Sequence, residues 1–374
     1  MSNARNLANL LGTDTKIATI DIADEVFQAN KNLIINGAAQ VAQRGDVTGI
    51  SSNSYGGPDR FRLNVIGLGT FSISQSTTAP EGFANSYKLD CTTADASPAA
   101  GDLLRVNYFI EGQDLQSLAY GTSDAKAITL SFYVRSNKTG TYNIQFQQSD
   151  NSFKQAVLSY TIDSANTWEF KSITVAGDTA GVINNDNGAG LNLSWVLGAG
   201  SNYTSGSERP TYTAFANADI ASTQTVNLAD STSNEWYITG VSLEIGDVAT
   251  PFEHESYAAT LQKCQRYYVS SGFNSGTPYG GGGIAMYAFN SNEAGGTVIF
   301  PATMRDGPTI RTKNASGNIG GIHRAAVGDV TSGVAIQWTS NAESNKVGFS
   351  GLTKSNAWAA GNMLIGVWDA NAEL

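Results

Sequence analysis

Short stretches in which apolar and polar residues alternate with a period of two restrict the fold of this chain more than any other feature. Successive side chains of a strand point to opposite faces, so each stretch predicts a strand with one packed and one hydrated face. Turn-forming residues follow each stretch, which predicts an all-β protein of antiparallel sheets. The plainest examples are AITLSFYVRS (127–136), TYNIQFQQS (141–149), QAVLSYTID (155–163), WEFKSITVA (168–176) and WYITGVSLEIG (236–246).

The sequence divides into four segments. Residues 1–31 form a leader, and residues 32–255 carry the alternating stretches, which predict an antiparallel jelly-roll sandwich. SYAATLQKCQRYY (256–268) has apolar residues at helical spacing and predicts a connector helix. Strand patterns resume beyond the glycine-dense stretch 272–283, so residues 269–374 predict a smaller C-terminal β-sandwich.

Within the sandwich, NLIING (32–37) predicts a first strand that Asn36-Gly37 stops with a turn. Two polar stretches, 178–190 and 197–210, predict long loops. Loops on a rigid sandwich are the usual place for a binding site, so we expect ligand contacts there.

The leader combines a short helical pattern with a second apolar stretch. A segment of this length cannot bury its own apolar face, so we expect it to pack on copies of itself or on a docking protein. A frayed tail is the alternative. The candidate attachment and oligomerisation residues are Leu7, Leu10, Leu11, Ile17, Ile20 and Ile22.

Composition and charge exclude several classes of protein. The net charge is −10 with no basic run, which argues against nucleic acid as a partner. The sequence contains no apolar stretch of membrane-spanning length and no secretory signal pattern, so membrane insertion is not expected. Cys91 and Cys264 are expected to be buried thiols, and without Cys/His metal spacing we expect no metal and no cofactor.

GDVATPFEHESY (246–257) raises the question of catalysis, because His254 lies between Glu253 and Glu255. A metal ligand or proton shuttle is one interpretation, and a polar exit from the sandwich is the other. We favour the exit: Phe252 packs on the sandwich and Ser256 caps the helix that follows. The remaining acids are scattered and no GxSxG motif occurs, so we expect no enzyme activity.

Aromatic residues in loops are the candidate ligand contacts, because they offer large, rigid surface to a ligand. A place in the core is the alternative for each of them. Trp168 and Trp236 lie in alternating strand patterns and are predicted to be core. The candidate ligand-binding residues are Trp195, Tyr203, Tyr279, Tyr287, Trp338 and Trp358.

Three stretches resemble bacteriophage tail fibres and related virion proteins. NARNLANLLGTDTKIATIDIADEVFQANKNLIINGAAQVAQRG (3–45) is similar to their N-terminal region. EWYITGVSLEIGDVATPFEHESYAATLQKCQRYYV (235–269) resembles their closing strand, exit and helix, and VIFPATMRDGPTI (298–310) resembles an FPxxMRxxPT segment of the following domain. The resemblance implies a virion structural protein, often a homotrimer, that is mounted on other tail or connector proteins by its N-terminus. It also implies that the C-terminal β domain, residues 269–374, faces the host surface and is the candidate receptor-binding tip.

The middle segment also resembles the jelly roll of carbohydrate-binding modules, through AITLSFYVRS and WEFKSITV. Many such modules hold a structural calcium with acidic residues. Gln40 and Thr239-Gly240 occupy those positions here, so the ligand set is incomplete and no ion is predicted.

These expectations combine into one hypothesis and two alternatives. The first is a tail fibre in the virion, assembled in the host cytoplasm and exposed outside, that binds host polysaccharide or lipopolysaccharide by non-catalytic, multivalent contact. The second is a head or tail decoration or connector protein without a receptor. The third is a depolymerase of envelope polysaccharide, which needs two carboxylates in one cleft.

Overall fold

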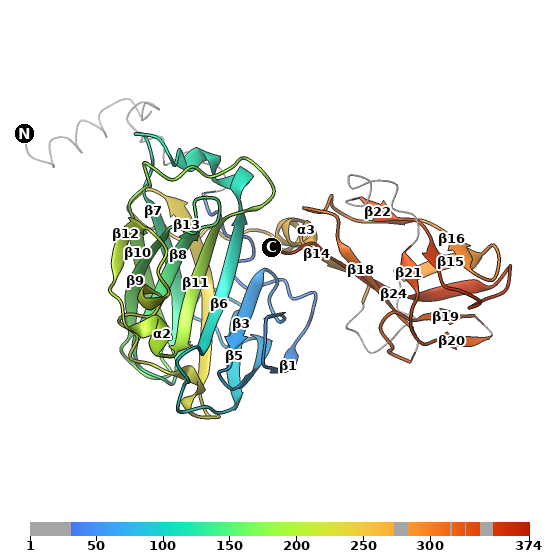
Figure 1. The fold of residues 1–374 in the computed structure, drawn as a ribbon, viewed down its shortest axis with the longest axis horizontal. Helices are drawn as coiled ribbons and strands as arrows, with labels where there is room; N and C mark the ends of the chain where they lie inside the picture. The colour runs from blue at the N-terminus through green and yellow to red at the C-terminus, as the bar shows by residue number, and fades with distance from the viewer. Residues whose placement is uncertain (1–30, 273–282, 315, 326, 337–346) are drawn as a thin grey trace, which may run out of the picture.

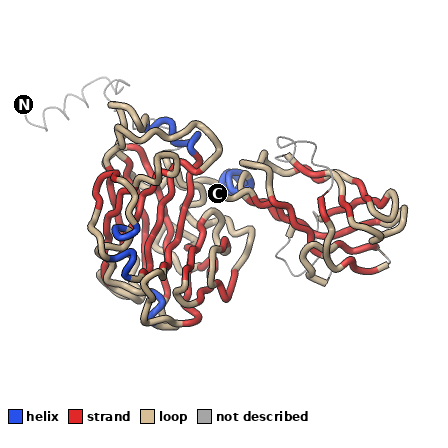
Figure 2. Tube along the Cα trace, viewed as in Figure 1, coloured by secondary structure: helices blue, strands red, loops and turns tan. Residues whose placement is uncertain are grey.

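The computed structural model describes residues 31–272, 283–314, 316–325, 327–336 and 347–374. They form two β domains joined by one helix, α3 (Tyr257–Gln265), as Figure 1 shows. Strands dominate both domains and helices are few (Figure 2), which confirms the predicted all-β class. The six attachment candidates of the leader lie outside the described residues.

The middle domain is a sandwich of two antiparallel sheets between which the chain crosses repeatedly, as in a jelly roll. Sheet A has the order β1 (Val47–Ile50), β4 (Thr70–Ser76), β5 (Ser86–Thr93), β13 (Glu235–Ile245), β7 (Ile128–Ser136) and β10 (Glu169–Val175). Sheet B has the order β12 (Arg209–Thr213), β9 (Gln155–Ile162), β8 (Gly140–Gln148), β11 (Ala189–Ala199), β6 (Leu103–Glu111), β3 (Phe61–Ile66) and β2 (Ser54–Tyr55). The short helices are η3 (Gly112–Leu118), α2 (Ser201–Thr204), η4 (Asn217–Asp219) and η5 (Leu228–Asp230).

The five quoted strand stretches of the middle domain correspond to β7, β8, β9, β10 and β13. Their apolar positions meet between the sheets, where the ring of Trp195 on β11 lies 5.9 Å from that of Phe132 on β7. Trp236 is fully buried, as predicted, whereas Trp168 is only half-buried and packs edge-on against Tyr237.

NLIING does not form the predicted strand. Residues 32–37 run as irregular chain against β13, and the only regular feature is a turn beginning at Ile35. Asn36 adopts φ 63°, and its amide donates to the carbonyls of Val41 and Asp59. Gly37 lies so close to β13 that an added Cβ would sit 2.0 Å from the Val241 carbonyl oxygen. The Asn-Gly pair therefore makes the predicted turn. Leu33 and Gly37 each form one backbone hydrogen bond with β13, at 2.9 Å and 3.0 Å, but residues 32–37 are not paired with it as a strand.

The exit from the sandwich has the predicted form. Ser256 caps α3, and its hydroxyl accepts a hydrogen bond from the Ala259 amide at 3.3 Å. Phe252 packs on the sandwich with its ring 5.1 Å from that of Phe83, and the His254 ring stacks on the same pair. Aromatic packing accounts for the position of His254.

The C-terminal domain is smaller and is organised around one long strand, β24 (Met363–Asn371). The first half of β24 pairs with β15 and β19, and its second half pairs with β14 and β18. The strands are β14 (Tyr268–Ser270), β15 (Ile284–Ala288), β16 (Glu293–Gly295), β17 (Val298–Ile299), β18 (Thr309–Lys313), β19 (Ile322–Arg324), β20 (Gly328–Val330), β21 (Ala335–Ile336), β22 (Gly348–Phe349), β23 (Leu352–Thr353) and β24.

Both cysteines are buried and unoxidised, as predicted. Within the described ranges, no helix has the length and apolar character needed to cross a membrane.

The two domains meet at a buried network of ion pairs, which we call the domain joint. Glu373 accepts hydrogen bonds from Arg44 and Arg60, and Arg60 is only 1 % exposed. The Arg60 guanidinium lies 3.3 Å from the centre of the Tyr267 ring, and that of Arg44 lies 3.7 Å from the centre of the Tyr268 ring. The joint consists of Arg44, Asp59, Arg60, Glu111, Arg266, Tyr267, Tyr268 and Glu373.

Two of the three stretches that carry the virion-protein resemblance supply residues of the joint, and the third contacts it, because the Arg305 amide donates to the Arg266 carbonyl at 2.7 Å. The QRG of the first stretch supplies Arg44, and the CQRYY of the second supplies Arg266, which pairs with Glu111 at 2.6 Å. The FPxxMRxxPT stretch supplies Arg305, whose guanidinium donates to the Asn187 carbonyl of the middle domain at 2.7 Å. The motifs therefore share a structural role in holding one domain to the other.

Candidate ligand-binding groove

The outer face of sheet B is polar, and this follows from the same alternation that builds the core. Val106, Leu193 and Ile144 point between the sheets, so their neighbours along each strand point outward. The register of the four central strands places these neighbours directly side by side. They form one row across the sheet, from β3 to β8: Arg62, Asn107, Ser194 and Gln145.

Several side chains of this face are buried without a hydrogen-bond partner. Asn107 is 1 % exposed, and within the described chain neither its amide oxygen nor its amide nitrogen has a partner. The Ser194 hydroxyl and the Asn192 amide oxygen beside it are in the same condition. A buried polar group without a partner costs about 1–3 kcal/mol, so this cluster lowers stability and points to a ligand or to bound water.

Two neighbouring amide side chains on the same face do have hydrogen-bond partners, in contrast to Asn107. Asn143 on β8 donates to the Thr223 hydroxyl at 2.8 Å and accepts from the Thr223 amide at 3.2 Å. Gln155 on β9 donates to the Ala216 carbonyl at 2.9 Å. The segment 205–224 thus covers the β8–β9 side of the face and leaves the β6–β3 side to other partners.

Two arginines lie over the cluster. The Arg105 guanidinium donates to Asn64 at 3.1 Å and to Gln145 at 3.3 Å. The Arg62 guanidinium lies 4.5 Å from the centre of the Phe109 ring and donates to the Leu374 carbonyl oxygen at 3.5 Å. Of the Asp and Glu side chains that the structure describes, none lies within ion-pairing distance of either.

The surroundings of Arg105 lower the pKa of its guanidinium. Burial and the neighbouring Arg62 cation lower the pKa of Arg105 from its usual 12.5 to about 10. The phenol of Tyr203 acts in the opposite direction, which places Tyr203 near the same guanidinium. Arg105 is therefore a cation held in an unfavourable environment.

A cavity of about 510 Å³ adjoins this cluster at the β2–β3 edge, between the two domains. Arg62 belongs to both, so we treat cluster and cavity as one site and call it the arginine groove. The volume lies within the range of ordinary small-ligand sites, about 300–1,000 Å³. The cavity is lined by Arg44, Val47, Asn53, Ser54, Tyr55, Arg62, Tyr268, Arg311 and Asn371.

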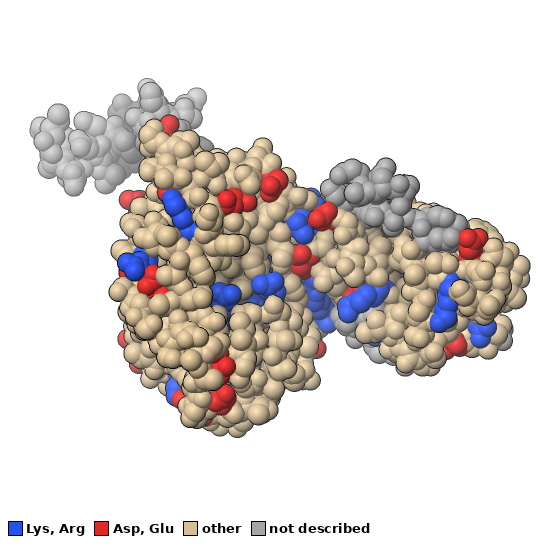
Figure 3. Space-filling model, in the orientation of Figure 1, with Lys and Arg blue, Asp and Glu red and all other residues tan. Residues whose placement is uncertain are grey.

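Figure 3 shows the groove on the surface. Basic side chains lie in a hollow over β6 and β3, the strands that carry Arg105 and Arg62, and further basic side chains follow toward the boundary between the domains. On this face they form a band, although the chain as a whole is acidic.

The carboxylates around the cavity are occupied by arginines. Asp369 is fully buried and pairs with Arg311, and Glu373 pairs with Arg44 and Arg60. Burial raises the pKa of Asp59 to about 6, but its side chain is 1 % exposed and both oxygens accept hydrogen bonds from Gln43. None of the three is placed like a general acid that meets a substrate.

The sequence-predicted aromatic contacts are not assembled in this groove. Trp195 and Trp358 belong to the two cores, at 0 % and 5 % exposure, so they are core residues rather than ligand contacts. Tyr203 is half-buried beside Arg105, and Tyr287 is exposed on β15, far along the chain in the other domain. Tyr279 and Trp338 lie outside the described residues.

The arginine groove was missed by the sequence reasoning because its residues lie in strands and not in loops. FRLNVI (61–66) and LLRVNYFIE (103–111) also alternate, but neither stretch was among the predicted strands. Each of these two strands carries one arginine and one asparagine at outward-facing positions, and this repeated pattern was the sequence signal that could have indicated the groove.

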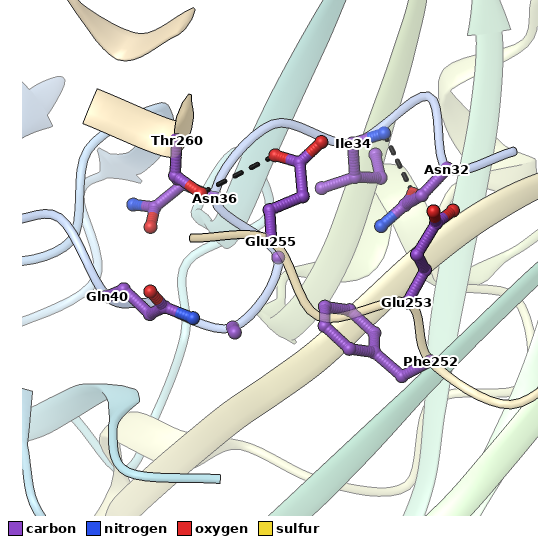
Figure 4. A pocket seen from close by; sticks show the side chains of 10 residues that line it. Asn32, Ile34, Asn36, Gln40, Phe252, Glu253, Glu255 and Thr260 are labelled. Atoms are coloured by element: carbon purple, nitrogen blue, oxygen red, sulfur yellow. Dashed lines mark hydrogen bonds between the residues drawn. The ribbon is translucent and has the colours of Figure 1, made fainter. Parts of the chain in front are cut away.

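The stretch with His254 lines a different, very small pocket (Figure 4). Asn32, Phe252, Glu253 and Glu255 surround about 20 Å³, and Glu255 accepts a hydrogen bond from Thr260 on α3. Such a volume holds about one water molecule, so this is a packing joint and not a sugar site. In the described part of the chain, no three His, Cys, Asp or Glu residues are grouped to hold a metal ion.

No family model matches this chain, and no curated protein matches it. One similar solved structure is the enzymatically active domain of bacteriophage CBA120 tailspike protein 4, at 12 % identity and a TM-score of 0.32, with 57 % of this chain and 21 % of that chain covered. Another is the family 11 carbohydrate-binding module from Clostridium thermocellum in complex with a β-1,3-1,4-mixed-linked tetrasaccharide, at 12 % identity and a TM-score of 0.29, with 55 % and 98 % covered. This chain thus spans about a fifth of the tailspike domain, and likenesses of this degree carry no argument about function.

Proposed function

We propose that this protein binds glycan without cleaving it, through the arginine groove. The observation that carries the proposal is the cluster of buried, unpartnered polar groups at Asn107, Asn192 and Ser194 beside an open cavity. A sugar carries several hydroxyls, each of which donates and accepts, so it satisfies amide and hydroxyl groups together. Tyr55, which is half-buried in the cavity wall, adds aromatic surface, whereas the Tyr268 ring is buried beneath Arg44.

We further propose that the protein is a bacteriophage virion protein, most simply a tail fibre whose glycan ligand lies on the host surface. The three motifs that suggest this family converge on the domain joint, which supports their use as one set. A trimer mounted by residues 1–31 on other tail proteins would present three grooves, and three weak contacts give avidity. Such a particle is assembled in the host cytoplasm and acts outside the cell.

A glycan array of bacterial capsular and O-antigen polysaccharides tests the binding proposal. The full chain is applied to the array, and a reducing-end assay on the same polysaccharides measures cleavage. We expect retention on a subset of glycans without release of oligosaccharides. Retention on none would refute glycan binding and favour the decoration or connector alternative, whereas released oligosaccharides would establish the depolymerase.

Immunogold labelling of phage particles that carry the protein tests the virion role. Gold at tail fibres supports the proposal, and gold at the head, or none on particles, contradicts it. Deleting the C-terminal domain is a poor test, because the deletion also removes Glu373 and leaves Arg60 buried without its carboxylate partner.

A further inference from the structure

The arginine groove has more positive charge than its surroundings neutralise. Arg44 and Arg60 share Glu373, and Arg311 pairs with Asp369, so these cations have carboxylate partners. Arg62 and Arg105 have none among the described Asp and Glu side chains. In a chain of net charge −10, two neighbouring cations without a partner among the described Asp and Glu side chains require an explanation.

The two arginines act on the same space. They lie on adjacent strands, where Asn64 pairs with Arg105 and Arg62 with Asn107 in the register of β3 and β6. Both arginines are half-buried residues, Arg62 lies directly beside the unpartnered Asn107 in the strand register, and the Arg62 side chain also borders the cavity. Their mutual repulsion is unfavourable in the empty groove and is relieved by an anion between them.

Resting on the proposed function, we infer that the arginine groove selects acidic glycans, whose carboxylate or phosphate group binds between Arg62 and Arg105. A guanidinium presents a planar fork of N–H donors that matches the oxygens of a carboxylate or a phosphate. The neutral hydroxyls of the same sugar then meet Asn107, Ser194 and the polar wall of the cavity. A neutral glycan would leave the two cations unpaired and would bind more weakly.

The test compares matched polysaccharides that differ in charge. Polygalacturonate and its carboxyl-reduced form probe the carboxylate, and phosphomannan and its dephosphorylated form probe the phosphate. Binding of the full chain is measured by affinity electrophoresis at low and high NaCl. We expect at least one acidic form to bind about 10-fold or more tightly than its neutral counterpart, and we expect salt to remove the difference.

Two variants assign the selectivity to the groove. Arg62→Gln should lower affinity for the acidic form about 10-fold or more and leave the neutral form unchanged. Arg62→Lys keeps the charge but not the fork and should give an intermediate loss. Lys126→Gln is the control of equal charge, because Lys126 is exposed and lies just before β7, in the other sheet.

The outcomes separate the inference from the proposed function. Equal affinity for acidic and neutral forms, with binding lost in Asn107→Leu, would keep the function and overturn the selectivity. Binding of neither form while the array also shows nothing would overturn both. Tighter binding of a single-stranded oligonucleotide than of any acidic glycan would assign the groove to nucleic acid instead. An effect of Lys126→Gln as large as that of Arg62→Gln would show that only net charge matters.

Discussion

Asn107 and Asn143 are the same residue type on the same face of one sheet, yet their environments differ. Asn143 is held at both ends of its amide by Leu158 and Thr223, whereas both amide atoms of Asn107 are buried without a partner. Because an unpaired buried amide lowers stability, the presence of Asn107 at this position points to a ligand or to bound water.

Replacing each asparagine by leucine separates the two roles. Asn107→Leu should leave the free energy of unfolding unchanged or raise it by about 1 kcal/mol, and it should lower glycan affinity about tenfold. Asn143→Leu should lower the free energy of unfolding by about 1–3 kcal/mol, because Thr223 and Leu158 lose their partners. Urea unfolding and the glycan array measure both. Equal destabilisation by the two changes would show that Asn107 has a structural partner, such as bound water.

Asp59 gives the joint a dependence on pH. Burial raises the pKa of its carboxyl from 3.8 to about 6, so between these values the folded state binds more protons than the unfolded state. Its contribution to stability is therefore largest below about pH 3.8 and is lost as the pH rises through about 6. Relative to Asp59→Asn, the wild-type protein should lose thermal stability between pH 4 and pH 7. A difference in Tm that stays constant over this range would contradict the shift.

At the scale of elements, the sequence predicted strands well where one face is buried. Alternation identified β7, β8, β9, β10 and β13, and helix-cap chemistry identified α3 with Ser256. It failed for β11, because LNLSWVLG lies between glycine-rich polar stretches that were assigned to loops. It also failed for NLIING, whose apolar residues contact β13 without pairing as a strand. Whether an apolar run pairs or only packs depends on residues far away in the sequence.

Gly37 is the position at which this packing is most sensitive. A Cβ there would sit 2.0 Å from the Val241 carbonyl oxygen, so Gly37→Ala should force β13 and the NLIING segment apart and destabilise the protein by about 1–3 kcal/mol. Gly101→Ala is the control, because a Cβ at Gly101 would lie 3.9 Å from the Asn202 amide nitrogen, an ordinary contact distance, and the change should alter stability by less than about 0.5 kcal/mol. Chemical unfolding of both variants checks the difference, and equal stabilities would show that the segment is loosely held.

At the scale of the whole molecule, neither the domain joint nor the arginine groove could be predicted from the sequence. Arg62 and Arg105 are 43 positions apart by their numbers, and Arg44 meets a carboxylate more than 300 positions away. Charge counting along the chain cannot tell which of these arginines has a partner. Only the register of β3 with β6, and the docking of the second domain, separates the paired cations from the unpaired ones.

The joint should couple the stabilities of the two domains. Glu373→Gln removes the carboxylate shared by Arg44 and Arg60, and breaking such a buried pair costs about 3–5 kcal/mol. Calorimetry should then show the two domains unfolding at more widely separated temperatures than in the wild-type protein. Glu81→Gln, at an exposed loop position, should have no effect. Identical traces for the two variants would mean that the ion pairs do not hold the domains together.

The central place of β24 has a consequence for how the protein is made. The middle domain emerges from the ribosome early and has all its strands, but β24 and Glu373 are translated only after every segment that they contact. Until then the second domain lacks its central strand, and Arg44 and Arg60 lack their carboxylate. Synthesis that stops a few codons early would therefore yield a chain with one finished domain and one unfinished domain, which proteases can recognise before the chain enters an assembly.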